Sequence, residues 1–247
     1  MVVMVLAFFV LWSVPLRVFA EDTHVPGGSR IALANFDTDP PLTFPQQWQI
    51  HGDEETARDV YTVVAEEGNQ FLRAYADKQD VQIGISRLIK AKEFPHLRWR
   101  WRAKQLPPGA NERAVKTNDS VASVYVIFDS KLFPRAIKYV WSSSLPIGTR
   151  FISPVYWRSH TVVLQSGATQ ANKWQLETVN FYHDYKTLFG DEPSAVLGFA
   201  VLTDSDMTNS IAEADYDDFA VLSEAAVSAE EGSRAAVQPV PATDGGQ

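Results

Sequence analysis

The six residues Leu97–Arg102 constrain the fold of this chain more than any other segment, because apolar and cationic side chains alternate strictly along them (Leu-Arg-Trp-Arg-Trp-Arg). A period of two places successive side chains on opposite faces of an extended chain, so the segment predicts a half-buried β-strand. We expect Trp99 and Trp101 to face a core. The other face carries the cationic side chains Arg98, Arg100 and Arg102.

Similar alternation elsewhere predicts about ten strands separated by turns that contain Pro or Gly. Val121–Phe128 is one example, since every second residue from Ala122 is apolar. Within this region only Tyr182–Phe189 reads as a helix, because Gly190 suits its C-terminal cap. Many strands with one short helix predict an all-β fold, a two-sheet antiparallel sandwich of jelly-roll-like form. A closed barrel is the alternative.

The ends of the chain differ from its middle. Residues 1–20 read as a secretory signal peptide, in which an apolar run precedes small residues at Val18 and Ala20. An uncleaved anchor and a buried helix are the alternatives. We expect a linker over residues 21–30, the sandwich domain over 31–223 and a disordered acidic tail over 224–247. The protein is then exported, periplasmic or secreted, with no transmembrane span after signal cleavage.

Charge and cysteine content exclude several kinds of protein. The formal net charge is −8 and the chain has no Cys. An acidic chain without a basic tail lacks the electrostatic attraction that nucleic-acid binding requires. Without Cys there are no disulfides, thiolate metal sites or Cys nucleophiles. Stability must therefore come from the core, to which seven Trp, eight Tyr and fourteen Phe can contribute large buried areas.

Several short motifs together resemble an uncharacterised bacterial family, domain of unknown function 3047. They are Leu97-Arg-Trp-Arg-Trp-Arg102, Leu106-Pro-Pro-Gly-Ala110, Asn118-Asp119, Tyr125-Val-Ile-Phe128, Tyr139-Val-Trp141, Trp174, Asp184-Tyr185, Phe189-Gly190, Gly198-Phe-Ala200, Thr203-Asp-Ser-Asp206 and Tyr216-Asp-Asp218. The resemblance implies an exported β-sandwich of the type seen in carbohydrate-binding modules, with no assigned activity. Two departures are Ser123, where the family tends to carry Arg, and the order Met207-Thr-Asn209.

The arginine row offers one candidate ligand site. Planar guanidinium groups bind carboxylates and phosphates through paired hydrogen bonds, so the row predicts a groove for an anionic ligand. Arg100 would be central, with Tyr125 or Trp141 as a stacking platform and Asp119 nearby. The alternative is a solvated sheet face on which acids of neighbouring strands, such as Glu177 or Asp129, pair with the arginines.

Acidic residues near the end of the domain offer a candidate metal site. Ca²⁺ takes six to eight oxygen ligands from loops of this composition, although the spacing is not that of an EF-hand. The candidate ligands are Asp204, Asp206, Asn209, Asp217 and Asp218. Solvated turn aspartates that cap strands are the alternative. No other cofactor is expected.

Catalytic motifs are sparse. The five His residues are scattered, with no HExxH pair, and no GxSxG elbow or glycine-rich phosphate loop occurs. Glycoside cleavage needs two carboxylates flanking the sugar bond, for which the candidates are Asp119, Asp204, Asp206 and Glu177.

We therefore expect non-catalytic binding of a carbohydrate or cell-envelope polymer through one sheet face or loop rim. A structural or partner-binding envelope protein is the first alternative, and a carbohydrate-active enzyme with paired carboxylates is the second. An exposed Arg or aromatic strip would favour binding, and an exposed apolar patch would favour a partner. Two carboxylates in a cleft, one with a shifted pKa, would favour an enzyme.

Overall fold

The computed structural model describes residues 29–130 and 133–236, so the predicted signal peptide and most of the predicted linker lie outside the described residues. The strands are β1 (Arg30–Ala34), β2 (Gln49–His51), β3 (Tyr61–Glu66), β4 (Asn69–Asp77), β5 (Gln82–Ile89), β6 (His96–Gln105), β7 (Ala122–Phe128), β8 (Arg135–Ser142), β9 (Arg150–Ile152), β10 (Ser159–Ser166), β11 (Gln175–Asn180), β12 (Val196–Leu202) and β13 (Ile211–Leu222). The helices are α1 (Glu54–Val60), α2 (Phe181–Phe189) and α3 (Glu224–Ala236), with a 3-10 turn at Val115–Thr117.

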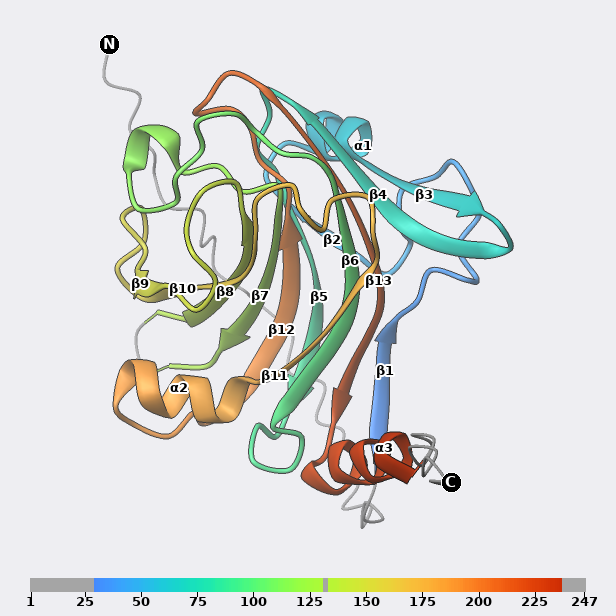
Figure 1. The fold of residues 1–247 in the computed structure, drawn as a ribbon, viewed down its shortest axis with the longest axis vertical. Coiled ribbons are helices and arrows are strands. Elements are labelled where there is room, and N and C mark those ends of the chain that lie inside the picture. Colours follow the sequence, from blue (N-terminus) through green and yellow to red (C-terminus); the bar gives the residue numbers. More distant parts are fainter. Residues whose placement is uncertain (1–28, 131–132, 237–247) are drawn as a thin grey trace, which may run out of the picture.

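The strands form two stacked sheets (Figure 1). The first sheet has the order β11-β6-β13-β4-β3, and β1 pairs with β13 beyond the end of β4. The second sheet has the order β2-β5-β12-β7-β8-β10-β9. All pairs are antiparallel except β8 and β10, which run parallel and make the second sheet mixed. The predicted all-β sandwich is confirmed.

The tryptophans of β6 form the centre of the core between the sheets. Trp99 and Trp101 are fully buried, and their ring centroids lie 5.3 Å apart in an edge-to-face arrangement. Trp99 contacts Tyr139, and Trp101 contacts Trp141, both across the sandwich on β8. Aromatic rings bury large areas and prefer such tilted contacts, so these pairs stabilise the association of the two sheets.

The helices differ from the prediction in number. Helix α2 matches the expected helix, and Gly190 ends it in the left-handed region (φ 76°). Helix α1 was not predicted, although Asp53 caps its N-terminus by accepting from Thr56 N at 2.8 Å. Helix α3 lies where we expected a disordered tail, so that prediction is wrong for residues 224–236. It is held because Ala226 and Val227 pack on Leu222 at the end of β13.

Candidate functional site: an acidic pocket on the second sheet

The arginine row does not form the predicted groove. The guanidinium of Arg100 binds Asp217 at 2.6 Å and Asp218 at 2.7 Å, both on the neighbouring strand β13. Arg102 likewise binds Asp215 and Glu66, while Arg98 binds Glu230 of α3. These ion pairs occupy the outer face of the first sheet, so the alternative of an ion-paired face is the one that the structure shows, with acids other than those expected.

A β-bulge explains how one arginine meets two aspartates. The pairing of β13 with β6 shifts between Asp217 and Ala220, and Asp218 adopts a positive φ of 57°. A bulge places two residues opposite one on the partner strand. Here it brings the carboxylates of Asp217 and Asp218 to the same guanidinium.

The other predicted ligand-binding residues separate from the arginines. Trp141 is fully buried in the core and donates from Nε1 to the Gly167 carbonyl at 3.0 Å, so it is no stacking platform. Asp119 is buried and accepts from the backbone N of Thr208 at 2.7 Å, which fixes the loop between β12 and β13. Tyr125 lies on β7 of the second sheet, away from Arg100.

The proposed calcium ligands also divide between two places. Asp217 and Asp218 pair with Arg100, whereas Asp204 and Asp206 line a cavity over the second sheet. Asn209 is exposed and turns the loop with φ 49°. Among the described residues no group of three or more His, Asp or Glu side chains is arranged to hold a metal ion. The five predicted calcium ligands therefore do not come together in one site.

The cavity lies on the outer face of the second sheet and has a volume of about 460 Å³. Its floor is formed by side chains that point away from the core, Gln82 of β5, Tyr125 of β7 and Lys138 of β8. Each alternates along its strand with core residues, such as Val124 and Val126 on either side of Tyr125. The period of two therefore determines which polar groups reach this face.

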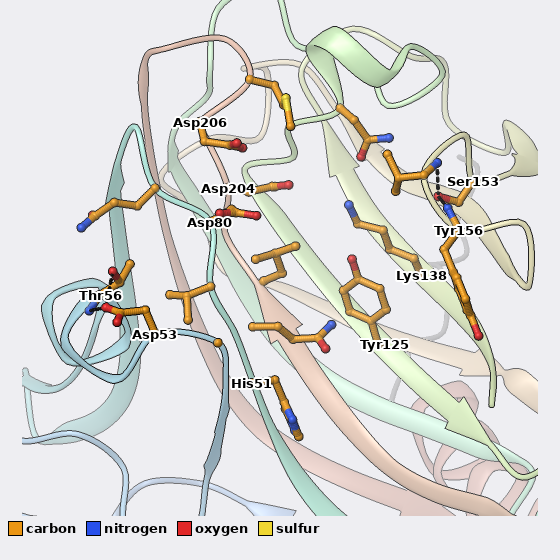
Figure 2. A pocket seen from close by; sticks show the side chains of 18 of the residues that line it. His51, Asp53, Thr56, Asp80, Tyr125, Lys138, Ser153, Tyr156, Asp204 and Asp206 are labelled. Carbon is orange, nitrogen blue, oxygen red and sulfur yellow. Dashed lines mark hydrogen bonds between the residues drawn. The ribbon is translucent and has the colours of Figure 1, made fainter. Parts of the chain in front are cut away.

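Three groups of residues form the walls. One contains His51, Asp53 and the turn between β4 and β5 with Asp80. The second is the loop after β9, where Ser153, Val155 and Tyr156 face the cavity. The third contains Asp204 and Asp206, which follow β12. Figure 2 shows the carboxyl groups of Asp80, Asp204 and Asp206 turned toward the interior.

Asp204 and Lys138 are buried ionisable groups of the pocket whose pKa values are both raised. Burial, aided by the carboxylates of Asp119 and Asp206 and opposed by Lys138, raises the pKa of Asp204 to about 8. Ser120 N donates to its Oδ1 at 2.7 Å. Asp204 is therefore largely protonated near neutral pH. Burial opposes the charge on Lys138, but Tyr125 and the nearby acids raise its pKa above the usual value.

The remaining acids add negative charge at the cavity mouth. Burial, with Asp206 and Asp119 nearby, raises the pKa of Asp80 to about 6, although the residue as a whole remains open to water. Burial and Asp119 also raise the pKa of Asp206. Behind Lys138, Glu112 is buried and accepts from Ser142 Oγ at 2.7 Å, and burial raises its pKa. The cavity thus combines one buried cation with several carboxyl groups. Among these carboxyl groups, Asp204 keeps its proton to the highest pH.

This arrangement can bind a polyhydroxyl ligand and can also exchange protons with it. Lys138 donates, ionised carboxylates accept, and Gln82 and Asn118 do both. Val81, Val155 and Leu202 supply apolar surface beside them. A few converging polar groups on a largely apolar wall are typical of small-molecule sites. A neutral carboxylic acid beside ionised ones is the feature expected of a site for acid–base chemistry.

Among the predicted catalytic acids, the structure brings together only Asp204 and Asp206, with Asp119 directly behind them. Glu177 lies on β11 of the first sheet, where it accepts from Trp101 Nε1 at 3.1 Å and from Gln165. The sequence analysis missed Asp80 and Lys138. Lys138 gave a signal, since it is a lone cation inside the strand pattern Ile137-Lys-Tyr-Val-Trp141. Asp80 gave none, because it stands in a polar turn like many others.

Within the described residues, no helix has the length and apolar character needed to span a membrane.

Comparison with solved structures finds similar chains at low identity. A family 30 carbohydrate-binding module of a cellulosomal cellulase of Clostridium thermocellum is 12% identical, with a TM-score of 0.42, and the match covers 78% of this chain and 98% of that one. The family 11 xylanase from Neocallimastix patriciarum is 8% identical, with a TM-score of 0.33, and covers 79% and 96%. A carbohydrate-binding module specific for non-crystalline cellulose, CBM28, is 10% identical, with a TM-score of 0.32, and covers 83% and 97%. These similarities are too distant to carry a function to this chain.

A search of curated protein sequences finds no match. The profile of one family, described as a protein of unknown function (DUF3047), matches residues 46–220. The matched region extends from just before β2 almost to the end of β13, and so contains the pocket and both sheets apart from β1. The chain therefore belongs to the DUF3047 family.

Proposed function

We propose that the pocket over the second sheet binds a carbohydrate, as part of an exported protein that recognises a polysaccharide or another cell-envelope polymer. One observation carries the proposal: Tyr125 and Lys138, which are direct neighbours on β7 and β8, and Gln82 of β5, beyond β12, all reach a cavity of about 460 Å³. Sugars present closely spaced hydroxyl groups and apolar C–H faces. A rigid sheet floor can match both, because its side chains are fixed at regular spacing.

Calorimetric titration tests the proposal with cello-, xylo- and chito-oligosaccharides and with soluble peptidoglycan fragments. Gln82→Ala removes a polar group from the pocket floor and is expected to weaken binding about five- to tenfold, since a hydrogen bond contributes roughly 1 kcal/mol. Gln175→Ala is the matched control, because Gln175 lies on edge strand β11 of the first sheet. Binding by no member of this panel, or equal loss in both variants, would contradict the proposal.

The carboxyl groups favour a second candidate, cleavage of a glycosidic bond in the same pocket. Asp204 would donate its proton to the glycosidic oxygen as the C–O bond breaks. Ionised Asp80 or Asp206 would take a proton from the water that attacks the anomeric carbon. The products are a reducing sugar and an alcohol, with both carboxyl groups restored by proton exchange with solvent.

Release of reducing ends from the same panel distinguishes the two candidates. Cleavage that is lost in Asp204→Asn, with binding retained, would establish the second candidate. Binding without release of reducing ends over a day would contradict cleavage and support the first candidate, carbohydrate binding without catalysis.

A further inference from the structure

The loop from Ser153 to Ser159, which forms one wall of the pocket, is held rigidly. Ser153 N donates to the Ser159 carbonyl at 2.8 Å and closes the base of the loop. Ser159 N donates to the Tyr156 carbonyl at 2.8 Å, which forms a tight turn with Trp157 and Arg158 at its centre. The Tyr156 hydroxyl donates to the Pro134 carbonyl at 2.8 Å. These bonds attach the loop to the start of β8.

Trp157 is the large aromatic side chain that this turn exposes. It is 70% exposed, whereas Trp99, Trp101 and Trp141 are fully buried. Burial of an indole is strongly favourable. An exposed Trp157 therefore lacks the stabilisation that burial gives the core tryptophans, and its apolar surface is available to a ligand.

The indole of Trp157 is held in place from one side. The guanidinium of Arg158 lies over its ring at 5.0 Å from the centroid. Arg158 is itself anchored, because its Nε donates to the Phe133 carbonyl at 3.0 Å and its other end donates to Ser130 Oγ. A cation over the electron-rich face of an indole is attracted to it, so Arg158 covers one face of the ring. The opposite face is left for another partner.

The position of Trp157 relates it to the pocket. Tyr156 on one side and Ser159 two residues later both line the cavity. Consecutive Cα atoms are about 3.8 Å apart, so the Cα of Trp157 lies within about 8 Å of lining residues in both directions. A chain of sugar rings that extends out of the pocket past Tyr156 would therefore come close to Trp157.

We propose that Trp157 is an outer stacking subsite, and that the ligand of this protein is therefore an oligosaccharide or polysaccharide chain. This inference rests on the proposed carbohydrate binding in the pocket. The pocket holds the hydrogen-bonded sugars, and the free indole face stacks on the C–H face of a further ring. Arg158 keeps that face oriented before binding, which reduces the entropy lost when the ligand is ordered.

The dependence of affinity on ligand length tests the inference. The probes are cello-, xylo- and chito-oligosaccharides from disaccharide to hexasaccharide, titrated calorimetrically into the full chain. In the wild type the affinity for the series that binds is expected to rise with length. Trp157→Ala is expected to lower affinity for the hexasaccharide about five- to tenfold and for the disaccharide less than twofold.

Three further variants make the test specific. Trp157→Phe keeps an aromatic face and is expected to retain most of the length dependence, whereas Trp157→Leu is apolar without a ring and is expected to lose it. Leu176→Ala is the control, because Leu176 is an exposed apolar side chain on β11 of the first sheet. Melting curves of all variants check that the fold is intact, which is expected because the substituted side chains are exposed to water.

The outcomes separate this inference from the proposed function. If neither these oligosaccharides nor the peptidoglycan fragments bind the wild type, both are overturned. If the wild type binds and Trp157→Ala retains the full rise of affinity with length, only the outer subsite is overturned. Equal retention of the length dependence by Trp157→Leu and Trp157→Phe would also overturn stacking, and would indicate a general apolar contact with the saccharide.

Discussion

A single residue of the pocket, Asp204, combines structural and chemical roles. It is nearly fully buried, accepts a hydrogen bond from Ser120 N, and lies in the field of Lys138 and of two other carboxyl groups. Burial of a carboxylate disfavours its charged form, which is the main reason that its pKa rises to about 8. The folded protein is therefore more stable with Asp204 protonated than with Asp204 ionised.

Stability should therefore depend on pH through Asp204. Its pKa in the folded protein, about 8, lies above the value near 4 of an exposed Asp, so the folded state binds the proton more tightly. The stabilisation from this proton is complete below about pH 4 and is lost as pH rises through about 8. Asp204→Asn does not titrate and keeps an acceptor for Ser120 N. We expect it to be more stable than the wild type at pH 8.5 by roughly 1–3 kcal/mol, with a smaller difference at pH 5.

Urea unfolding of both proteins at pH 5 and pH 8.5 measures the difference. The comparison removes the contributions of other raised acids, such as Asp80 and Asp217, since both proteins contain them. A difference between variant and wild type that is the same at both pH values would show that Asp204 does not titrate in this range.

Among the elements, β6 shows what the sequence could and could not predict. Its alternation placed Trp99 and Trp101 in the core and the arginines on the other face, because a period of two is a local property of one strand. The partners of the arginines were not predictable. Asp215 and Asp217 are 113 and 117 residues away from the arginines that they bind, and which strand lies beside β6 depends on the whole fold.

Two helices, α1 and α3, were not predicted because their local sequence patterns are weak. Helix α1 has a capping sequence in Asp53 and the two acids that follow it, but it is only seven residues long and was overlooked. Helix α3 has favourable Ala and Glu but no extended apolar stripe, so its sequence read as disordered. A contact outside the helix, with Leu222, fixes it instead.

The Arg100 ion pairs allow a prediction for the β6–β13 pair. Asp217 is almost fully buried, so removal of its cationic partner leaves a buried charge uncompensated. We expect Arg100→Met to lower the free energy of unfolding by about 1–3 kcal/mol at pH 7.5, because Asp217 retains a hydrogen bond from Asn69 and Asp218 is open to water. Met retains apolar contact with Trp174, over which the guanidinium now lies.

The double variant Arg100→Met with Asp217→Asn provides the control. It removes the buried charge together with its partner, and Asn can still accept from Asn69. We expect it to recover at least half of the lost stability in urea unfolding, with saccharide affinity unchanged because the pocket lies on the other sheet. A double variant less stable than Arg100→Met would show that the loss has a cause other than the uncompensated carboxylate.

For the molecule as a whole, the sandwich separates stability from the proposed function. The ion-paired face of the first sheet and the aromatic core hold the fold, and the outer face of the second sheet carries the pocket. Composition and strand alternation predicted the sandwich, since both follow from the need to bury one face of each strand. They did not predict the pocket, because it requires the turn at Asp80, the loop after β9 and the loop after β12 to meet over one sheet.

Helix α3 lies at the opposite end of the sandwich from the pocket loop Asp204–Ser210 (Figure 1). Strand β13 joins the two, and its 12 residues span about 40 Å at roughly 3.3 Å per residue. A chain that stops after Ser223 loses the burial of Ala226 and Val227 and the ion pair between Arg98 and Glu230. We expect it to be less stable by about 1–3 kcal/mol, mostly from burial of Val227.

The same truncation should leave the pocket unchanged, so saccharide affinity at a temperature well below the melting transition should stay within twofold of the wild type. Arg98→Ala in the full chain measures the ion-pair contribution alone and should cost less than the truncation, since a partly exposed pair contributes little. Because one core cluster contains residues of both sheets, thermal unfolding should remain a single transition in every variant. A separate low-temperature transition in the truncated chain would instead show that α3 is needed for the two sheets to unfold together.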